Sequence, residues 1–89
     1  MKYHVGLTTQ SSQEIRALNK RYRQIDRPTD VLSFNLNEPL GKDGLYLGDI
    51  VVCLEEAKKQ AKKHHISLEE EFGELVKHGA KHLLGWDHP

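Results

Sequence analysis

The sequence has a single cysteine, no long apolar run and no excess of charge of either sign. Cys53 has no partner within the chain, which excludes an internal disulfide framework and favours a reducing compartment. A membrane-spanning helix needs about 20 consecutive apolar residues, and no such run is present. The 13 basic and 13 acidic residues cancel, so any contact with nucleic acid must come from a local patch. These absences predict a cytoplasmic protein with no membrane partner, and they leave the oligomeric state open.

Apolar periodicity predicts three strands within one small domain. The length of 89 residues predicts a single domain, residues 1–89, with a modest core. Alternating apolar side chains predict strands over residues 2–7, 31–36 and 45–52. The near-continuous run from Ile50 to Val52 is typical of a buried strand.

Three helices are predicted between and after these strands. Capping boxes at Ser11–Glu14 and Ser67–Glu70 mark the starts of two of them, and the first ends before Pro28. The middle helix has an apolar face formed by Leu54, Ala57, Ala61 and either His64 or His65. The order β-α-β-β-α-α predicts an α+β fold, in which a small mixed sheet packs against helices in two layers.

Three histidines near the C-terminus have the spacing of metal ligands. His78 and His82 lie one turn apart if the last helix includes them. Gly85 favours the left-handed turn that ends a helix, so the chain can fold back and bring His88 to the same point. Three imidazoles and an open fourth position are typical of a catalytic zinc site. We expect one zinc ion per chain at the end of this helix, although a lone histidine in such a place would more often be structural.

The helical wheel places this histidine pair at the border between core and solvent, where a cleft would form. An apolar stripe adjoins the pair, and its members are Leu68, Phe72, Leu75, Val76, Gly79 and Leu83. Zinc peptidases of the His-Glu-x-x-His type place a general-base glutamate directly after the first histidine. Gly79 occupies that position here and cannot act as a base. The sequence therefore argues against peptide hydrolysis by that mechanism.

A second segment is rich in arginine. Between positions 18 and 34 it carries Lys20, Arg21, Arg23 and Arg27 together with Thr29, Asp30 and Ser33. Arginine suits bidentate contact with phosphate and stabilises developing phosphoryl charge. Such a cluster alone is more often a solvated surface, but a hydrolytic metal site beside it favours a phosphate-binding role.

These segments resemble the motifs of one known family, the YbeY family of rRNA maturation factors. The metal motif is the run from His78 to His88, and the short central motif is Gly48-Asp49-Ile50. The arginine-bearing motif reads Asn19-x-x-Tyr22-Arg23-x-x-Asp26-x-Pro28-Thr29-Asp30-Val31-Leu32-Ser33-Phe34. Family members usually extend before Met1 and past Pro89, so the resemblance implies a short or truncated member.

The resemblance also implies an activity and its residues. It implies a metal-dependent, single-strand-specific endoribonuclease that acts in ribosomal RNA maturation and ribosome quality control, with RNA and the small ribosomal subunit as partners. It implies zinc on His78, His82 and His88, with Arg23 as the catalytic arginine at the RNA phosphate. Asp87, next to a predicted ligand, is a candidate to orient a histidine ring or to carry a proton. An equally good interpretation is that Asp87 is only a turn residue.

Two alternatives remain open from the sequence. One is a metal hydrolase with another substrate, a different phosphoester or an amide. The other is a non-catalytic, ribosome-associated module in which zinc is a structural clamp.

Overall fold

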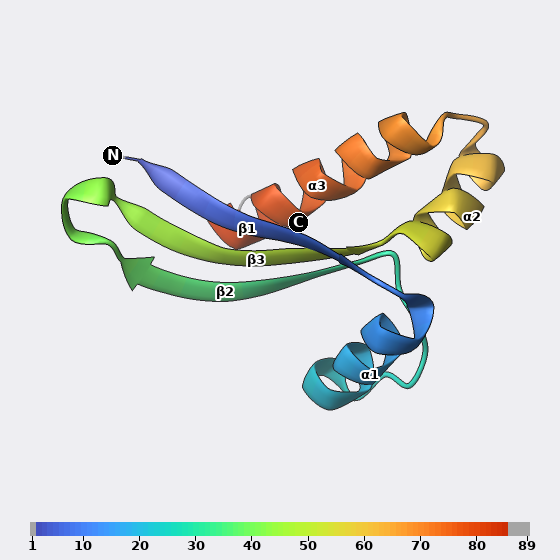
Figure 1. Ribbon diagram of the computed structural model, residues 1–89, viewed down its shortest axis with the longest axis horizontal. Coiled ribbons are helices and arrows are strands. Elements are labelled where there is room, and N and C mark those ends of the chain that lie inside the picture. The colour runs from blue at the N-terminus through green and yellow to red at the C-terminus, as the bar shows by residue number, and fades with distance from the viewer. Residues whose placement is uncertain (1, 86–89) are drawn as a thin grey trace.

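The computed structural model describes residues 2–85 of the chain (Figure 1). Strands and helices follow one another in the predicted order β-α-β-β-α-α, with a short 3-10 turn between the second and third strands. Their bounds are β1 (Tyr3–Gln10), α1 (Ser12–Arg23), β2 (Val31–Pro39), η1 (Gly41–Asp43), β3 (Leu45–Cys53), α2 (Leu54–His64) and α3 (Leu68–Leu84). None of the helices described between residues 2 and 85 is long and apolar enough to cross a membrane.

The three strands form one mixed sheet in the order β1-β3-β2. The central strand, β3, runs parallel to β1 and antiparallel to β2. Its residues Ile50, Val51 and Val52 are at most 6% exposed, which confirms the predicted buried strand. β2 continues to Pro39, beyond its predicted end, because an edge strand tolerates a proline that cannot donate a ladder hydrogen bond.

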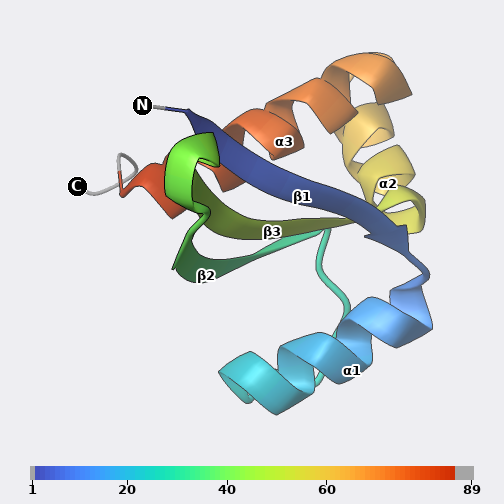
Figure 2. The same cartoon turned by 60° about the vertical axis from the view of Figure 1, so that its left-hand side comes forward.

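Helices cover both faces of this sheet (Figures 1 and 2). On one face, α2 and α3 pack over a cluster that includes Ile50 and Val52. On the other face, α1 packs through Ile15 against Val51 and Cys53. The sequence suggested two layers, and the structure has three. The cause is the alternation of side chains along β3, which places apolar groups on both faces of the sheet.

Both predicted capping boxes are present. The Ser11 hydroxyl accepts the backbone N–H of Glu14, whose carboxylate accepts the N–H of Ser11 in return. Ser67 and Glu70 make the same pair of hydrogen bonds at the start of α3. These bonds satisfy N–H groups that the first turn of a helix leaves without intrahelical partners.

Left-handed residues end the two helices that carry the candidate site. α1 stops at Arg23, before Pro28 as predicted, because Gln24 has a φ of 59° and turns the chain toward β2. α3 stops at Leu84, followed by Gly85 with a φ of 75°, which is the turn expected from the sequence.

A polar contact joins α2 to α3. The imidazole Nδ1 of His64 lies 2.9 Å from Oε1 of Glu71, a carboxylate that is only 4% exposed. The apolar face of α2 is formed by the buried Ala57 and Ala61. His64 therefore supplies a polar contact instead of extending that face, and His65 ends the helix in a left-handed conformation.

Candidate active site

A cavity of about 430 Å³ lies where α1, β2 and α3 meet. Its lining residues are Arg23, Val31, Leu32, Ser33, His78, Gly79 and His82. α1 and α3 cover opposite faces of the sheet, but both reach the outer side of β2, because β2 is an edge strand. The fold thus brings the arginine-bearing motif and the first two histidines of the metal motif to one place.

His78 and His82 lie as the helical wheel predicted. Both are exposed, and they flank a buried ridge of α3 that contains Leu75, Gly79 and Leu83. Two imidazoles one turn apart on the wall of an open cavity fit a zinc ion, which prefers nitrogen ligands. Among residues 2–85, no group of three or more histidine, cysteine or acidic side chains is placed to hold a metal ion. The predicted third ligand, His88, lies outside the described residues, as do Asp87 and Trp86.

Position 79 has no room for a side chain. A Cβ atom there would lie 2.9 Å from Cγ2 of Ile50 in β3. The glycine therefore allows α3 to approach the sheet closely, which sets the depth of the two histidines beside it. A glutamate at this position would point into the core, so the peptidase arrangement excluded on chemical grounds is also excluded sterically.

The open edge of β2 presents backbone groups to the cavity. The N–H of Cys53 donates to the carbonyl of Asp30, which makes this a hydrogen-bonded pair of the antiparallel ladder. Such pairs alternate with pairs whose N–H and C=O groups point away from the partner strand. In the observed register, Val31 and Ser33 belong to the second kind. Their N–H and C=O groups therefore point to the open edge, and both residues line the cavity.

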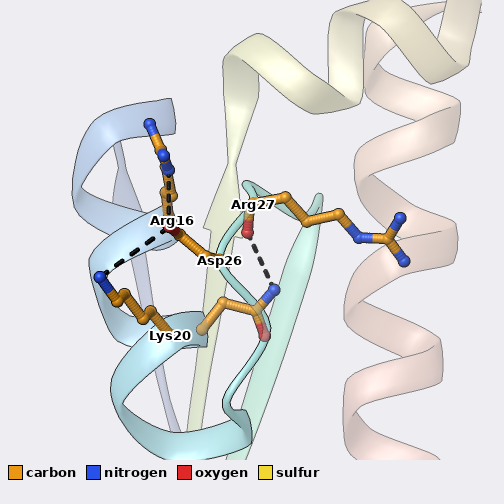
Figure 3. Close-up of polar contacts among 5 residues, drawn as sticks. Arg16, Lys20, Asp26 and Arg27 are labelled. Atoms are coloured by element: carbon orange, nitrogen blue, oxygen red, sulfur yellow. Dashed lines mark hydrogen bonds and ion pairs between the residues drawn. The ribbon is translucent and has the colours of Figure 1, made fainter.

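The cations of α1 and of the segment that follows it divide into paired and unpaired groups (Figure 3). Nε of Arg16 lies 2.8 Å from Oδ1 of Asp26, and Nζ of Lys20 lies 3.9 Å from Oδ2. The hydrogen bond from Arg16 lowers the pKa of the Asp26 carboxyl below its ordinary value. Figure 3 shows the Arg27 side chain extending away from this group. Arg23 and Arg27 form no ion pair with any residue in the 2–85 range.

Asn19 fixes the segment that follows Arg23. Its side chain is 2% exposed, and its Nδ2 donates a 2.9 Å hydrogen bond to the carbonyl of Arg27. The backbone carbonyl of Asn19 accepts a 3.3 Å hydrogen bond from the backbone N–H of Ile25. These bonds hold residues 24–30 against α1, so the chain enters β2 beside Arg23. The sequence includes Asn19 in the arginine-bearing motif but assigns it no role, and a further signal is its place as a polar residue on the apolar side of an amphipathic helix.

The short central motif has a structural role among the described residues. A Cβ atom on Gly48 would collide with the carbonyl of Phe34 in β2, so this position, at an irregularity in the β2–β3 ladder, requires glycine. The Tyr46 hydroxyl donates a hydrogen bond to Asp49, which raises the pKa of that tyrosine. The motif therefore shapes the central strand that supports α3 through Ile50.

Comparisons with known proteins agree with these observations. The family model described as "Endoribonuclease YbeY" matches residues 1–89. A protein of that name from Picosynechococcus sp. is 50% identical over 93 residues, which cover 98% of this chain and 57% of the relative. One from Aquifex aeolicus is 53% identical over 76 residues, which cover 85% of this chain and 50% of the relative. The chain spans about half the length of the curated relatives that it matches.

The fold is also similar to a solved structure. The solution structure of TM1509 from Thermotoga maritima superposes with a TM-score of 0.66 at 39% sequence identity. The similarity covers 99% of this chain and 55% of that one. With a family model matching the whole chain, and with relatives near 50% identity over most of it, the chain belongs to the Endoribonuclease YbeY family.

Proposed function

We propose that this chain carries the active site of a metal-dependent endoribonuclease that cleaves single-stranded RNA. The observation that carries the proposal is the shared cavity, which Arg23 enters from α1 while His78 and His82 enter from α3. Nothing local in the sequence requires these segments to meet. The names of the curated relatives, Endoribonuclease YbeY, support the reaction class.

The metal is proposed to be one zinc ion held by His78, His82 and His88. When bound, zinc supplies Lewis-acid charge to the phosphoryl group and an activated water at neutral pH. The helix fixes the first two imidazoles in position, and the left-handed turn at Gly85 gives the chain a route back toward them.

Arg23 is proposed to bind the scissile phosphate. Arg23 lines the cavity, is exposed and has no competing ion pair among residues 2–85. Two parallel N–H groups can contact two phosphate oxygens and stabilise the charge that develops on them. The outward N–H groups of Val31 and Ser33 are further donors for the same anion. No acidic residue lines this cavity in the described part of the chain, so nothing there repels a phosphate.

The biological setting is proposed from the family. It is ribosomal RNA maturation and ribosome quality control in the cytoplasm, with the small ribosomal subunit as a partner. Asp87 is proposed to orient a ligand imidazole or to carry a proton.

The test is cleavage of a single-stranded oligoribonucleotide by the purified chain, compared with the matching duplex and the DNA version. Arg23→Ala is expected to lower cleavage by roughly 10²–10³-fold, the usual loss for one transition-state donor, with metal content unchanged. Arg21→Ala is the matched control, because Arg21 is also exposed on α1 but lies over the Tyr22 ring and does not line the cavity. Equal cleavage by both variants would remove Arg23 from the mechanism.

A chelator distinguishes this function from its alternatives. Loss of cleavage on chelation and its recovery with zinc support the proposal. A metal-loaded protein that unfolds on chelation, and never cleaves RNA, would instead support a structural clamp. Hydrolysis of another phosphoester without RNA cleavage would support a different substrate.

A further inference from the structure

A second cavity lies beside the first and shares Arg23 with it. Its volume is about 370 Å³, at the lower end of the range for small-ligand pockets. It lies between the end of α1, the segment that leads into β2, and α2. Its lining residues are Asn19, Arg23, Ile25, Arg27, Pro28, Thr29, Asp30, Glu56 and Gln60. A ligand that occupies both cavities would therefore contact Arg23 in each of them.

The two cavities differ in charge. The described lining of the first contains arginine and histidines but no carboxylate. The second contains the carboxylates of Asp30 and Glu56 together with Arg27 and the carboxamide of Gln60. Carboxylates repel a phosphate group, so the second cavity is poorly suited to one. Mixed donors and acceptors instead match the edge of a nucleobase, which presents both within a few ångströms.

Several polar groups of this second cavity can form further hydrogen bonds. The guanidinium of Arg27 forms no ion pair with a described residue. Among the described residues, the carboxylate of Asp30 accepts one side-chain hydrogen bond, a long one of 3.5 Å from Thr29. Oδ1 of Asn19 is buried and has no partner in the 2–85 range. Glu56 is less available, because its Oε2 lies 2.9 Å from Nζ of Lys59.

We infer that the second cavity is the subsite for the nucleobase next to the scissile phosphate. This inference rests on the proposed function, since it places the phosphate on Arg23 in the first cavity. The base then enters the second cavity, where the carboxylate of Asp30 accepts hydrogen bonds from the N–H groups of the base. Arg27 can donate hydrogen bonds to the other polar atoms of the base, and Gln60 can both donate and accept them. Guanine presents two adjacent N–H donors to a carboxylate, whereas uracil presents one N–H between two carbonyls. Guanine is therefore the base that fits best.

The test is a binding titration that does not depend on cleavage. The probes are guanosine 5′-monophosphate, uridine 5′-monophosphate and inorganic phosphate, added to the full 89-residue chain. Side-chain amide signals in NMR spectra provide the readout, because Asn19 and Gln60 line the second cavity. The guanosine nucleotide is expected to shift both signals and to bind more tightly than the uridine nucleotide. Inorganic phosphate is expected to leave both signals in place.

Two variants locate the subsite. Asp30→Asn keeps the shape of the side chain and is expected to weaken binding of the guanosine nucleotide by about tenfold or more, the loss for a hydrogen bond to a charged group. Gln60→Ala is expected to weaken it less and to raise the KM for RNA while kcat stays the same. The matched control is Gln13→Ala, an exposed glutamine of α1 that lines neither cavity.

The outcomes separate this inference from the proposed function. RNA cleavage with no nucleotide-induced shift at Asn19 or Gln60, and with an unchanged KM in the variants, would overturn the subsite and leave the nuclease standing. Shifts confined to residues of the first cavity would overturn it equally. Base-dependent shifts in a protein that never cleaves RNA would support a nucleobase site in the second cavity, but they would count against the nuclease and against a role for this site next to a scissile phosphate.

Discussion

The side-chain amide of Asn35, in the edge strand β2, donates a 3.1 Å hydrogen bond to the carbonyl oxygen of Leu83 in the last turn of α3. Carbonyls in a final turn lack intrahelical partners, so this bond satisfies one that would otherwise need water. Leu83 directly follows His82. The strand that lines the cavity therefore also holds the helical turn that carries a predicted metal ligand.

Asn35→Ala is expected to loosen this turn. The loss of one hydrogen bond predicts a drop of about 1 kcal/mol in the free energy of unfolding, with weaker metal binding because His82 is held less firmly. Thermal melting and a zinc titration measure the two effects. Glu38→Ala is the control, since it removes an exposed side chain from the same strand. Metal affinity unchanged in Asn35→Ala would show that the turn needs no support from β2.

Metal content should depend on the three predicted ligands. His78→Ala, His82→Ala and His88→Ala are each expected to lose most of the bound zinc in elemental analysis, because two imidazoles hold the ion far less tightly than three. His4→Ala is the control, since that imidazole contacts the carbonyl of Asp43 at 2.8 Å on the β1 side of the sheet. Full retention of zinc in the first two variants would refute the site.

Gly79→Ala should destabilise the fold, whereas Gly73→Ala should not. The first would place a Cβ atom 2.9 Å from Ile50, and overpacking of this kind costs about 1–3 kcal/mol. The second meets nothing within 4 Å, so the better helix propensity of alanine should add roughly 0.5–1 kcal/mol of stability. Urea denaturation measures both variants. Ile50→Ala should relieve the effect of Gly79→Ala, and a strictly additive double variant would count against this contact.

The pair of Arg16 and Asp26 should give a pH-dependent contribution to stability. The folded protein lowers the pKa of Asp26, so the pair stabilises the fold above the unfolded carboxyl value of about 3.9. This contribution is lost as the pH falls through the lower, folded value. Asp26→Asn is therefore expected to melt at a slightly lower temperature than the parent at pH 7 and at the same temperature in strong acid.

Salt provides the control for this pair. Its side chains are 56% and 49% exposed, so 1 M salt should shrink the difference at pH 7. Asp43→Asn, which removes an exposed carboxylate without an ion pair in the described part of the chain, should show no such dependence on salt. If the difference in melting temperature between Asp26→Asn and the parent stayed constant from neutral pH to strong acid, the charge of Asp26 would not be the source of its effect on stability.

Local features were predictable from the sequence, and the meeting of distant segments was not. The capping serines Ser11 and Ser67, the stop at Gly85 and the border position of His78 follow from bonds and angles within a few residues. The second helical layer was missed, although the run from Ile50 to Val52 carried the signal. A strand buried along its whole length needs cover on both faces.

The open edge and the second cavity depend on strand order, which no local pattern encodes. Val31 and Ser33 turn their backbone groups toward an open edge because, within residues 2–85, β2 pairs with β3 and with no other strand. Asp30 and Gln60 come together only because α2 follows β3 at the end where β2 begins. The arginine-rich sequence indicates phosphate binding. Only the structure shows which cations of this region pair with Asp26 and which line the two cavities.

The unpaired side of β2 also determines how a polymer can reach the site. An enclosed pocket receives a chain by its end, because the strand must be threaded into it. In the described part of the chain, Arg23 and His78 lie on either side of β2, whose outer edge has no paired strand. Under the proposed function, an RNA strand can therefore approach the site from the side, at any point along its length. Such lateral entry makes internal linkages as reachable as terminal ones, which is the topological requirement for cutting a strand in its middle.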